Sequence, residues 1–525
     1  MVSNKLAYDT AFHLFFARII GENSHIVPAV YNNLYKNFPI TYPYFCHWIL
    51  SFIPGKFIYT VSRYFSSLCD TIILLCIYYF CQYLVDIFHV SPNTPTISCI
   101  VYIIHPSLAR YTNGPRIAFF SPRVFAQLIF TLHIFSFFAY SISGNFVYII
   151  FSSIMNIIGL LSSKFYMQVI ASISIFMIIY DPSYALCILA PLLFGMIFKK
   201  IGMIKIITFS VQHSLYYKNF LQEAFLHPLH KNIKEYIVGF LKNKNAKEII
   251  AYINGSRHPF NTLFFFFPEI VIAIIFIPLN PLPQFSILLI PLAATLLASI
   301  LFEQKYFMFL GDGERYLQFS APLSCIVSSI FVFSHSYAAL YMYCFYGLCV
   351  HVYSLMRIKR VTKNYFGITD ENKNFFVLLD SMPEGKIFPI GKIEWYLLLL
   401  TNKTIISAPT NLSENYISSD EYNLLKGNEP FPSSDFSAVI DYFQPRYIVG
   451  TTYEIDEYVN NYLKDKNDFY KHTKAILQNG TLIAFEVVTQ ELSICQKGYH
   501  LKLSTETLID NTTGVYHENN AFNRN

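Results

Sequence analysis

Long apolar runs dominate residues 66–355, where stretches of many residues carry almost no charge. A bilayer is crossed by about 20 predominantly apolar residues in a helix. The runs therefore predict about ten transmembrane helices, of which those at 96–110 and 166–180 are the shortest. In chain order the predicted spans are 66–88, 96–110, 123–142, 145–161, 166–180, 183–198, 262–279, 284–302, 316–334 and 336–355.

The connections between these spans differ sharply between the two faces of the membrane. One face receives the long and charged segments, which are 1–65, 106–122, 162–164, 199–261, 303–315 and the C-terminal part. The other face receives tight connections, at 89–95, 143–144, 181–182, 280–283 and 335. Every motif with a chemical role is therefore predicted on the first face.

The loop 199–261 is basic and contains two amphipathic patterns, Tyr216–Phe225 and Lys231–Asn243. Such patterns are typical of helices that lie in the membrane interface. Its lysines fit either of two roles, attraction of anionic lipid phosphates or an ordinary solvated surface.

Residues 356–525 have the composition of a soluble protein and alternate between helix-like and strand-like runs. Asn479-Gly480 is a favoured turn dipeptide and predicts a hairpin over Ala475–Val488. Strands are also predicted at Phe375–Leu379, Lys403–Ala408 and Tyr447–Val449, and helices at Lys392–Leu400, Asp435–Phe443 and Ile455–Leu463. Residues after Leu492 are predicted to form a loose tail.

The fold class is thus a polytopic α-helical membrane protein with a small C-terminal α/β soluble domain. The predicted division is 1–65 for an acidic loop with interfacial helices, 66–355 for the transmembrane bundle and 356–525 for the α/β domain. Only 14% of residues are charged, against about a quarter in soluble domains. The net charge of +5 comes without a basic and aromatic stripe, so no nucleic-acid partner is expected. The ten cysteines show no metal-binding spacing.

Asp9 and His13 are spaced so that a helix would place both side chains on one face. A carboxylate at the rim of a membrane bundle suits a general base, because a low dielectric raises its pKa. The alternative is that Asp9 only caps the helix that it starts, by accepting backbone N–H groups. The two roles are compatible.

Three arginines, Arg110, Arg116 and Arg123, lie close together around Gly-Pro and Ser-Pro steps. Guanidinium groups bind phosphate oxygens bidentately, so this loop suits a phosphate or pyrophosphate. Lys164 is a further phosphate candidate at the same face. The alternative for all four is ordinary interfacial anchoring of helix ends.

Glu314 and Arg315 open a late span and suit substrate hydroxyls, and the alternative is a divalent cation bound by Asp312 and Glu314. Two carboxylates alone rarely hold a metal, so this metal reading is weak. Asp70 lies inside an apolar span, where an acid is a functional candidate, although a hydrogen bond to an interior hydroxyl explains it equally well.

These motifs resemble the membrane-embedded glycosyltransferases of the GT-C superfamily, which include protein mannosyltransferases, oligosaccharyltransferases and aminoarabinose transferases. The resembling features are Asp9-x-x-x-His13, Ile40-Thr-Tyr42-Pro43, His47-Trp48, Glu314-Arg315-Tyr316-Leu317 and the α/β module that ends in a hairpin. In that family a transmembrane helix normally precedes the acidic loop, whereas Asp9 here follows only eight residues.

The resemblance implies an inverting transfer from a polyprenyl-phosphate-linked sugar donor to a glycan, lipid or protein acceptor. Asp9 would be the catalytic base, with His13 beside it. Arg110, Arg116, Arg123 and Lys164 would bind the donor phosphate, and Glu314 and Arg315 would position the substrate. The cofactor stays open, with a divalent cation as one option. The resemblance also places the active face outside the cytoplasm, whereas the excess of Lys and Arg on that face would favour the cytoplasm.

Two other functions remain as alternatives. A transporter or flippase for a lipid-linked or anionic solute would favour inverted repeats and charges at mid-bilayer, and neither pattern is visible in the sequence. A non-catalytic membrane scaffold would bind a partner through residues 360–525 and would tolerate replacement of Asp9.

Overall fold

The computed structural model describes most of the chain. The described residues are 8–109, 120–216, 218, 238, 241–242, 261–276, 283–302, 304, 307–310, 313–364, 368–408, 416–426 and 431–488. Arg110, Arg116 and Asp312 lie outside these residues, as do the tail after Leu492 and nearly all of the two predicted amphipathic patterns.

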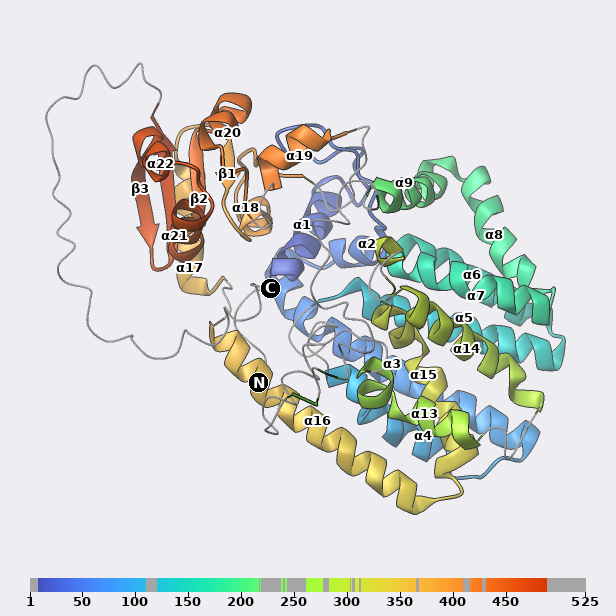
Figure 1. Cartoon of the computed structure of the whole chain (residues 1–525). Helices are drawn as coiled ribbons and strands as arrows, with labels where there is room; N and C mark the ends of the chain where they lie inside the picture. Colours follow the sequence, from blue (N-terminus) through green and yellow to red (C-terminus); the bar gives the residue numbers. More distant parts are fainter. Residues whose placement is uncertain are drawn as a thin grey trace, which may run out of the picture.

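Apolar helices make up most of the molecule (Figure 1). Four are long and apolar enough to cross a membrane: α3 (Gly55–Phe88), α5 (Pro122–Ser143), α15 (Glu314–Ser328) with its π-helical continuation η9 (Ser329–Phe333), and α16 (Tyr337–Asn364) over Tyr337–Met356. Shorter apolar helices are α4 (Thr94–Ile103) with η1 (Pro106–Ala109), α6 (Phe146–Ser162), α7 (Lys164–Tyr180), α8 (Tyr184–Ile197) and α14 (Ser286–Phe302). Further helical segments are α9 (Met203–Tyr216), η5 (Thr262–Phe266) and α13 (Pro268–Phe276).

Each predicted span overlaps helical residues, and a mostly helical architecture with four candidate membrane spans and a small C-terminal sheet is confirmed. The number of about ten transmembrane helices is not confirmed, because several of the helices are shorter than a bilayer crossing. The first span begins earlier than predicted, at Gly55.

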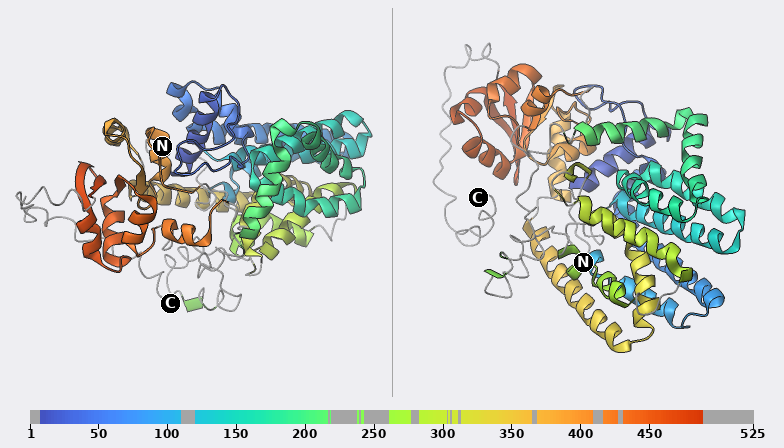
Figure 2. Two further views of the ribbon diagram at one scale, coloured as in Figure 1. Left: turned by 90° about the horizontal axis from the view of Figure 1, so that it is seen from above. Right: turned by 45° about the vertical axis from the view of Figure 1, so that its right-hand side comes forward.

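The central helix of the bundle is α15. Its most apolar window is 100% buried, against 28% for α3 and 22% for α16. A helix that is apolar all round belongs in a core, whereas one with exposed apolar residues suits contact with lipid. The right-hand view of Figure 2 shows α16, in yellow, along the lower edge of the bundle.

Two side-chain hydrogen bonds join neighbouring tight connections between the helices. The Asn93 side-chain amide donates to the Tyr337 hydroxyl at 3.0 Å, which joins the turn before α4 to the start of α16. The Ser141 hydroxyl donates to Asp181 at 3.3 Å, which joins the end of α5 to the turn before α8. Both contacts agree with the short connections that the sequence predicts.

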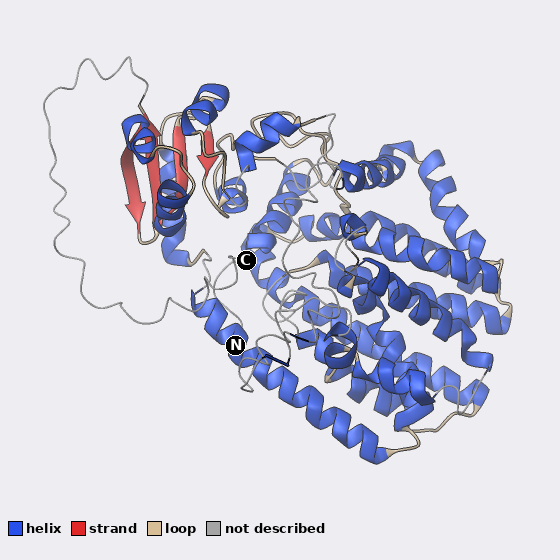
Figure 3. Cartoon of the chain, in the orientation of Figure 1, coloured by secondary structure: helices blue, strands red, loops and turns tan. Residues whose placement is uncertain are grey.

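The C-terminal part contains a four-stranded sheet in the order β1-β2-β4-β3 (Figure 3). Its strands are β1 (Ile387–Pro389), β2 (Tyr447–Thr451), β3 (Thr473–Asn479) and β4 (Leu482–Val487). β1 pairs parallel with β2, and the other pairs are antiparallel. The β3–β4 hairpin turns at Gly480 with a φ of 58°, as predicted. The accompanying helices are α17 (Asp370–Ser381), α18 (Glu394–Leu400), α19 (Ser419–Lys426), α20 (Phe436–Phe443), α21 (Thr452–Asn461) and α22 (Lys466–His472).

Two strand predictions in this part are wrong. Phe375–Leu379 lies within helix α17, where Phe375, Phe376 and Leu379 are buried while Val377 and Leu378 are exposed. That is the spacing of a helix face, which a short apolar run does not distinguish from a strand. The segment predicted as a strand at Lys403–Ala408 forms only isolated bridges, through Ile405.

Helix α1 (Tyr8–Glu22) packs between the C-terminal part and the bundle (Figure 1). Both terminal nitrogens of the Arg18 guanidinium donate at 2.8 Å, to the carbonyls of Leu398 and Leu399 at the end of α18. The Phe12 and Trp395 rings lie 4.7 Å apart. A guanidinium on the last carbonyls of a helix satisfies its unpaired acceptors. These contacts with α18 therefore fix the position of α1, the helix that carries Asp9.

Candidate active site

Asp9 is the second residue of α1, and its side chain is exposed. It therefore lies inside the first turn of the helix rather than at the capping position before it. His13 follows one turn later and is only 9% exposed. The two residues predicted to share a helix face thus differ in surroundings, with the acid open to solvent and the imidazole in the protein.

His13 forms a hydrogen bond with His47 of helix α2 (Phe45–Ser51), with 2.9 Å between Nδ1 and Nε2. Burial lowers the pKa of His13 well below its usual value, and the nearby His47 and Arg123 lower it further. Burial also lowers the pKa of His47, to about 3. Both rings are therefore neutral at pH 7, and one N–H donates to the lone pair of the other.

Tyr42 connects this histidine pair to the charged groups of the site. Its half-buried ring lies 5.7 Å from that of His47 and 6.2 Å from that of His13. Burial raises the pKa of Tyr42 to about 12, while Arg123 and Arg315 act to lower it and Asp9 acts to raise it. Such effects require charges nearby. Asp9 and the two arginines, from three separate helices, therefore all lie in the neighbourhood of Tyr42.

Three cations gather where α5, α7 and α15 begin. The guanidinium carbons of Arg123 and Arg315 lie 5.6 and 4.7 Å from the centre of the Phe165 ring. Lys164 precedes that phenylalanine and is close enough to Arg315 for their charges to repel. All three cations are half-buried. We call Arg123, Lys164 and Arg315 the cation cluster.

The helix starts add to the positive character of the cation cluster. Ser121 caps α5 by accepting the backbone N–H of Arg123 at 3.3 Å. Each cation occupies the first or second position of its helix, where the unpaired N–H groups and the helix dipole favour negative charge. The arrangement is chemically suited to an anion.

The structure brings together five of the eight residues predicted for the site, which are Asp9, His13, Arg123, Lys164 and Arg315. Glu314 begins α15 and is 2% exposed. Arg110 and Arg116 lie outside the described residues. Asp70 accepts a hydrogen bond of 2.9 Å from the Tyr102 hydroxyl, the interior contact that was the alternative to a functional role.

A divalent cation does not fit the described part of this site. Among the residues that the structure describes, no group of three or more His, Cys, Asp or Glu side chains is placed to hold a metal. Asp9 also shares its surroundings with Arg123 and Arg315, whose positive charges repel a metal ion.

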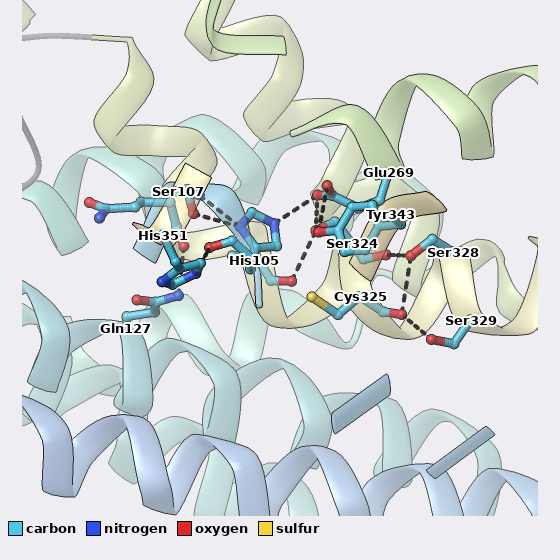
Figure 4. Close-up of polar contacts among 12 residues, drawn as sticks. His105, Ser107, Gln127, Glu269, Ser324, Cys325, Ser328, Ser329, Tyr343 and His351 are labelled. Atoms are coloured by element: carbon cyan, nitrogen blue, oxygen red, sulfur yellow. Dashed lines mark hydrogen bonds and ion pairs between the residues drawn. The ribbon is translucent and has the colours of Figure 1, made fainter. Parts of the chain in front are cut away.

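A second ionisable cluster lies deeper in the bundle and was missed by the sequence predictions (Figure 4). His105 Nε2 and Glu269 lie 2.8 Å apart, and both side chains are 0% exposed. Glu269 also accepts from the hydroxyls of Ser324 at 2.8 Å and Tyr343 at 3.3 Å. We call these four residues the His105–Glu269 network. The signal in the sequence was an acid within an apolar span, which holds for Glu269 as it does for Asp70.

Comparison with solved structures gives the fold. An oligosaccharyltransferase from Archaeoglobus fulgidus, solved with zinc and sulfate, matches 92% of this chain and 69% of its own at 12% identity and a TM-score of 0.54. The same archaeal enzyme with an inhibitory peptide and a dolichol-phosphate matches 89% of this chain and 68% of its own, at 12% identity and a TM-score of 0.52.

ArnT from Cupriavidus metallidurans, bound to undecaprenyl phosphate, matches 93% of this chain and 94% of its own at 9% identity and a TM-score of 0.51. No family model and no curated protein matches the sequence. The resemblance drawn from the motifs is confirmed at the level of the fold: this chain has the architecture of an archaeal oligosaccharyltransferase and of ArnT.

Proposed function

We propose that this protein is a membrane glycosyltransferase that moves a sugar from a polyprenyl-phosphate-linked donor to a glycan, lipid or protein acceptor. The observation that carries the proposal is the meeting of one exposed carboxylate and two arginines around Tyr42. An acid and a cation cluster are the two groups that this reaction needs.

The cation cluster would bind the phosphate of the donor. Guanidinium groups hold phosphate oxygens through paired, charge-assisted hydrogen bonds, and helix starts supply further N–H donors. The negative charge on the phosphate oxygen grows as its bond to the sugar breaks. Cations fixed beside that oxygen stabilise the transition state more than the ground state.

Asp9 would act as the general base on the acceptor. Its exposure leaves it open to an acceptor that arrives from solvent. The acceptor hydroxyl or amide would lose its proton to the carboxylate and attack the sugar carbon, while the lipid phosphate leaves from the opposite face. Attack opposite the leaving group inverts the sugar carbon, and the proton released by the acceptor stays on Asp9.

The solved structures of similar fold support this assignment. The archaeal oligosaccharyltransferase was solved with a dolichol-phosphate, and ArnT was solved with undecaprenyl phosphate. Both ligands carry a phosphate on a long polyprenyl chain. The four long apolar helices of the present chain suit an enzyme that takes such a substrate from the bilayer.

The test compares surface glycans and lipid-linked sugars by mass spectrometry in the wild type, a gene deletion and Asp9→Asn at matched expression. We expect one sugar to be lost from a glycan in both mutants, with its lipid-linked donor accumulating. Asp86→Asn is the matched control, because Asp86 is also an exposed acid but lies near the far end of α3. A wild-type profile in Asp9→Asn would refute the base assignment, and one in the deletion strain would refute transfer itself.

We further propose that the active face lies outside the cytoplasm. An alkaline phosphatase fused after residue 525 tests this placement, because that enzyme folds only where its disulfides form. Activity of the fusion is the expected result. An inactive but stable fusion would place the C-terminal part in the cytoplasm.

A further inference from the structure

Helix α15 contains a buried proline, Pro322, one turn after Gln318. Proline has no N–H, so the carbonyl four residues earlier loses its partner within the helix. That carbonyl belongs to Gln318. The Gln127 side-chain amide of α5 donates to it at 2.7 Å, in a fully buried contact. The Gln127 side chain of α5 thus donates to a main-chain carbonyl of α15 that has no donor within its own helix because of Pro322.

The position of this bond relates it to the candidate site. Gln127 lies one turn beyond Arg123 on α5, and Gln318 lies one turn beyond Arg315 on α15. Residues one turn apart lie on the same side of a helix. Both guanidinium groups contact the Phe165 ring, at 5.6 and 4.7 Å. The bond therefore joins the two helices directly beneath the two arginines.

We propose that Gln127 is a positioning residue for the donor-binding site. By donating to the carbonyl that Pro322 frees, it holds α5 in register with α15 and sets the separation of the Arg123 and Arg315 guanidinium groups. This inference rests on the proposed function, because those guanidinium groups are the ones that would bind the donor phosphate. Gln127 would not itself touch the substrate.

A second carbonyl freed by a proline also accepts from a side-chain amide in the bundle, and this bond provides a matched control. Pro191 lies inside α8 and frees the carbonyl of Cys187, to which the buried Asn156 amide of α6 donates at 2.8 Å. Neither α6 nor α8 begins with a member of the cation cluster. Loss of this bond removes a similar stabilising contact from two helices that carry no member of the cation cluster.

The experiment compares Gln127→Met and Asn156→Leu in the purified full-length protein. Both changes replace a buried amide with an apolar side chain and leave a carbonyl without its donor, so both are expected to lower the thermal midpoint. Binding of farnesyl phosphate in detergent is the second readout. We expect Gln127→Met to bind about tenfold more weakly, as loss of roughly one well-placed charged hydrogen bond implies, and Asn156→Leu to bind as the wild type does.

Equal affinity of Gln127→Met and the wild type would overturn the proposal, as would an equal loss of affinity in both variants. Arg315→Ala separates this failure from failure of the proposed function. If Arg315→Ala weakens binding and Gln127→Met does not, only the positioning role is wrong. If Arg315→Ala binds farnesyl phosphate as the wild type does, the phosphate assignment is wrong and the positioning role falls with it.

A second variant keeps the test decisive if Gln127→Met does not fold. In Gln127→Met/Pro322→Ala the alanine restores an N–H to α15, so the Gln318 carbonyl regains a partner within its own helix. Stability should recover, whereas affinity for farnesyl phosphate should stay low, because no bond joins the two helices. Recovery of both together would show a purely structural role for Gln127.

Discussion

The bundle holds two ionisable clusters that differ in charge and in access. In the His105–Glu269 network an acid meets an imidazole and two hydroxyls, and the His105 and Glu269 side chains are 0% exposed. In the cation cluster three groups of like charge lie together, half-buried, where three helices begin. The first cluster is fully buried, whereas the second is only half-buried and is suited to an anion.

The difference separates groups that stabilise the fold from groups that suit chemistry. A buried acid with a full set of donors strengthens the packing around it, and removing one partner leaves the other without compensation. Like charges held together oppose folding and are stabilised by a bound counter-charge. Substitutions in the two clusters should therefore have opposite profiles, with activity affected in one and stability in the other.

Among substitutions in the two clusters, the largest effect on activity is expected for Arg315→Ala. Sugar transfer should fall by about 10²- to 10³-fold, the usual cost of removing one donor that stabilises charge in a transition state. The free energy of unfolding should fall less than in Glu269→Leu, because the Arg315 side chain is only half-buried whereas that of Glu269 is 0% exposed. Arg315→Lys keeps the charge and loses the paired donors, so its rate of sugar transfer should lie between those of the wild type and Arg315→Ala. A strong loss of stability would remove the distinction between the clusters.

The largest effect on stability is expected for Glu269→Leu. His105 and the Ser324 and Tyr343 hydroxyls would lose their shared acceptor, which should lower the free energy of unfolding by about 3–5 kcal/mol. Denaturant titration in detergent measures this change in the free energy of unfolding. The double variant with His105→Leu should be more stable than Glu269→Leu alone, because it leaves no buried imidazole without its acceptor. If Glu269→Leu instead folds normally and loses transfer, the network belongs to the chemistry.

The pH dependence of stability tests the neutral histidine pair beside the cation cluster. The pKa of His47 is lowered by burial to about 3 in the folded protein, against about 6.5 when unfolded. Between these values the unfolded chain binds a proton that the folded protein excludes, so stability falls as pH drops below about 6.5. His47→Gln should reduce this slope by about 1.4 kcal/mol per pH unit. An unchanged slope between pH 6 and pH 4 would show that His47 is protonated in the folded protein.

The smallest effect is expected for Tyr102→Phe, which removes the hydroxyl bonded to Asp70. Loss of this contact should cost about 0.5–1.5 kcal/mol in unfolding, the usual net contribution of one hydrogen bond. Transfer by the folded protein should be unchanged. A loss of transfer without loss of stability would return Asp70 to the list of functional acids.

The contrast between the clusters also shows what the sequence could predict. Arg123, Lys164 and Arg315 were found because each marks the polar start of an apolar run, and hydropathy locates such starts well. Their meeting at Phe165 depends on which helices are neighbours, and periodicity carries no such information. Glu269 was hidden for the opposite reason, since a single acid hardly changes the hydropathy of a long apolar segment.

The central claim is that two groups near Tyr42 have separate roles: the cation cluster binds the donor phosphate, and Asp9 removes the acceptor proton. Titration of the purified wild type, Asp9→Asn and Arg315→Ala with farnesyl phosphate tests this most directly. Asp9→Asn should bind at least as tightly as the wild type, because a negative charge near the phosphate is removed, and Arg315→Ala should bind about tenfold more weakly. Weaker binding in Asp9→Asn, or wild-type affinity in Arg315→Ala, would contradict the account.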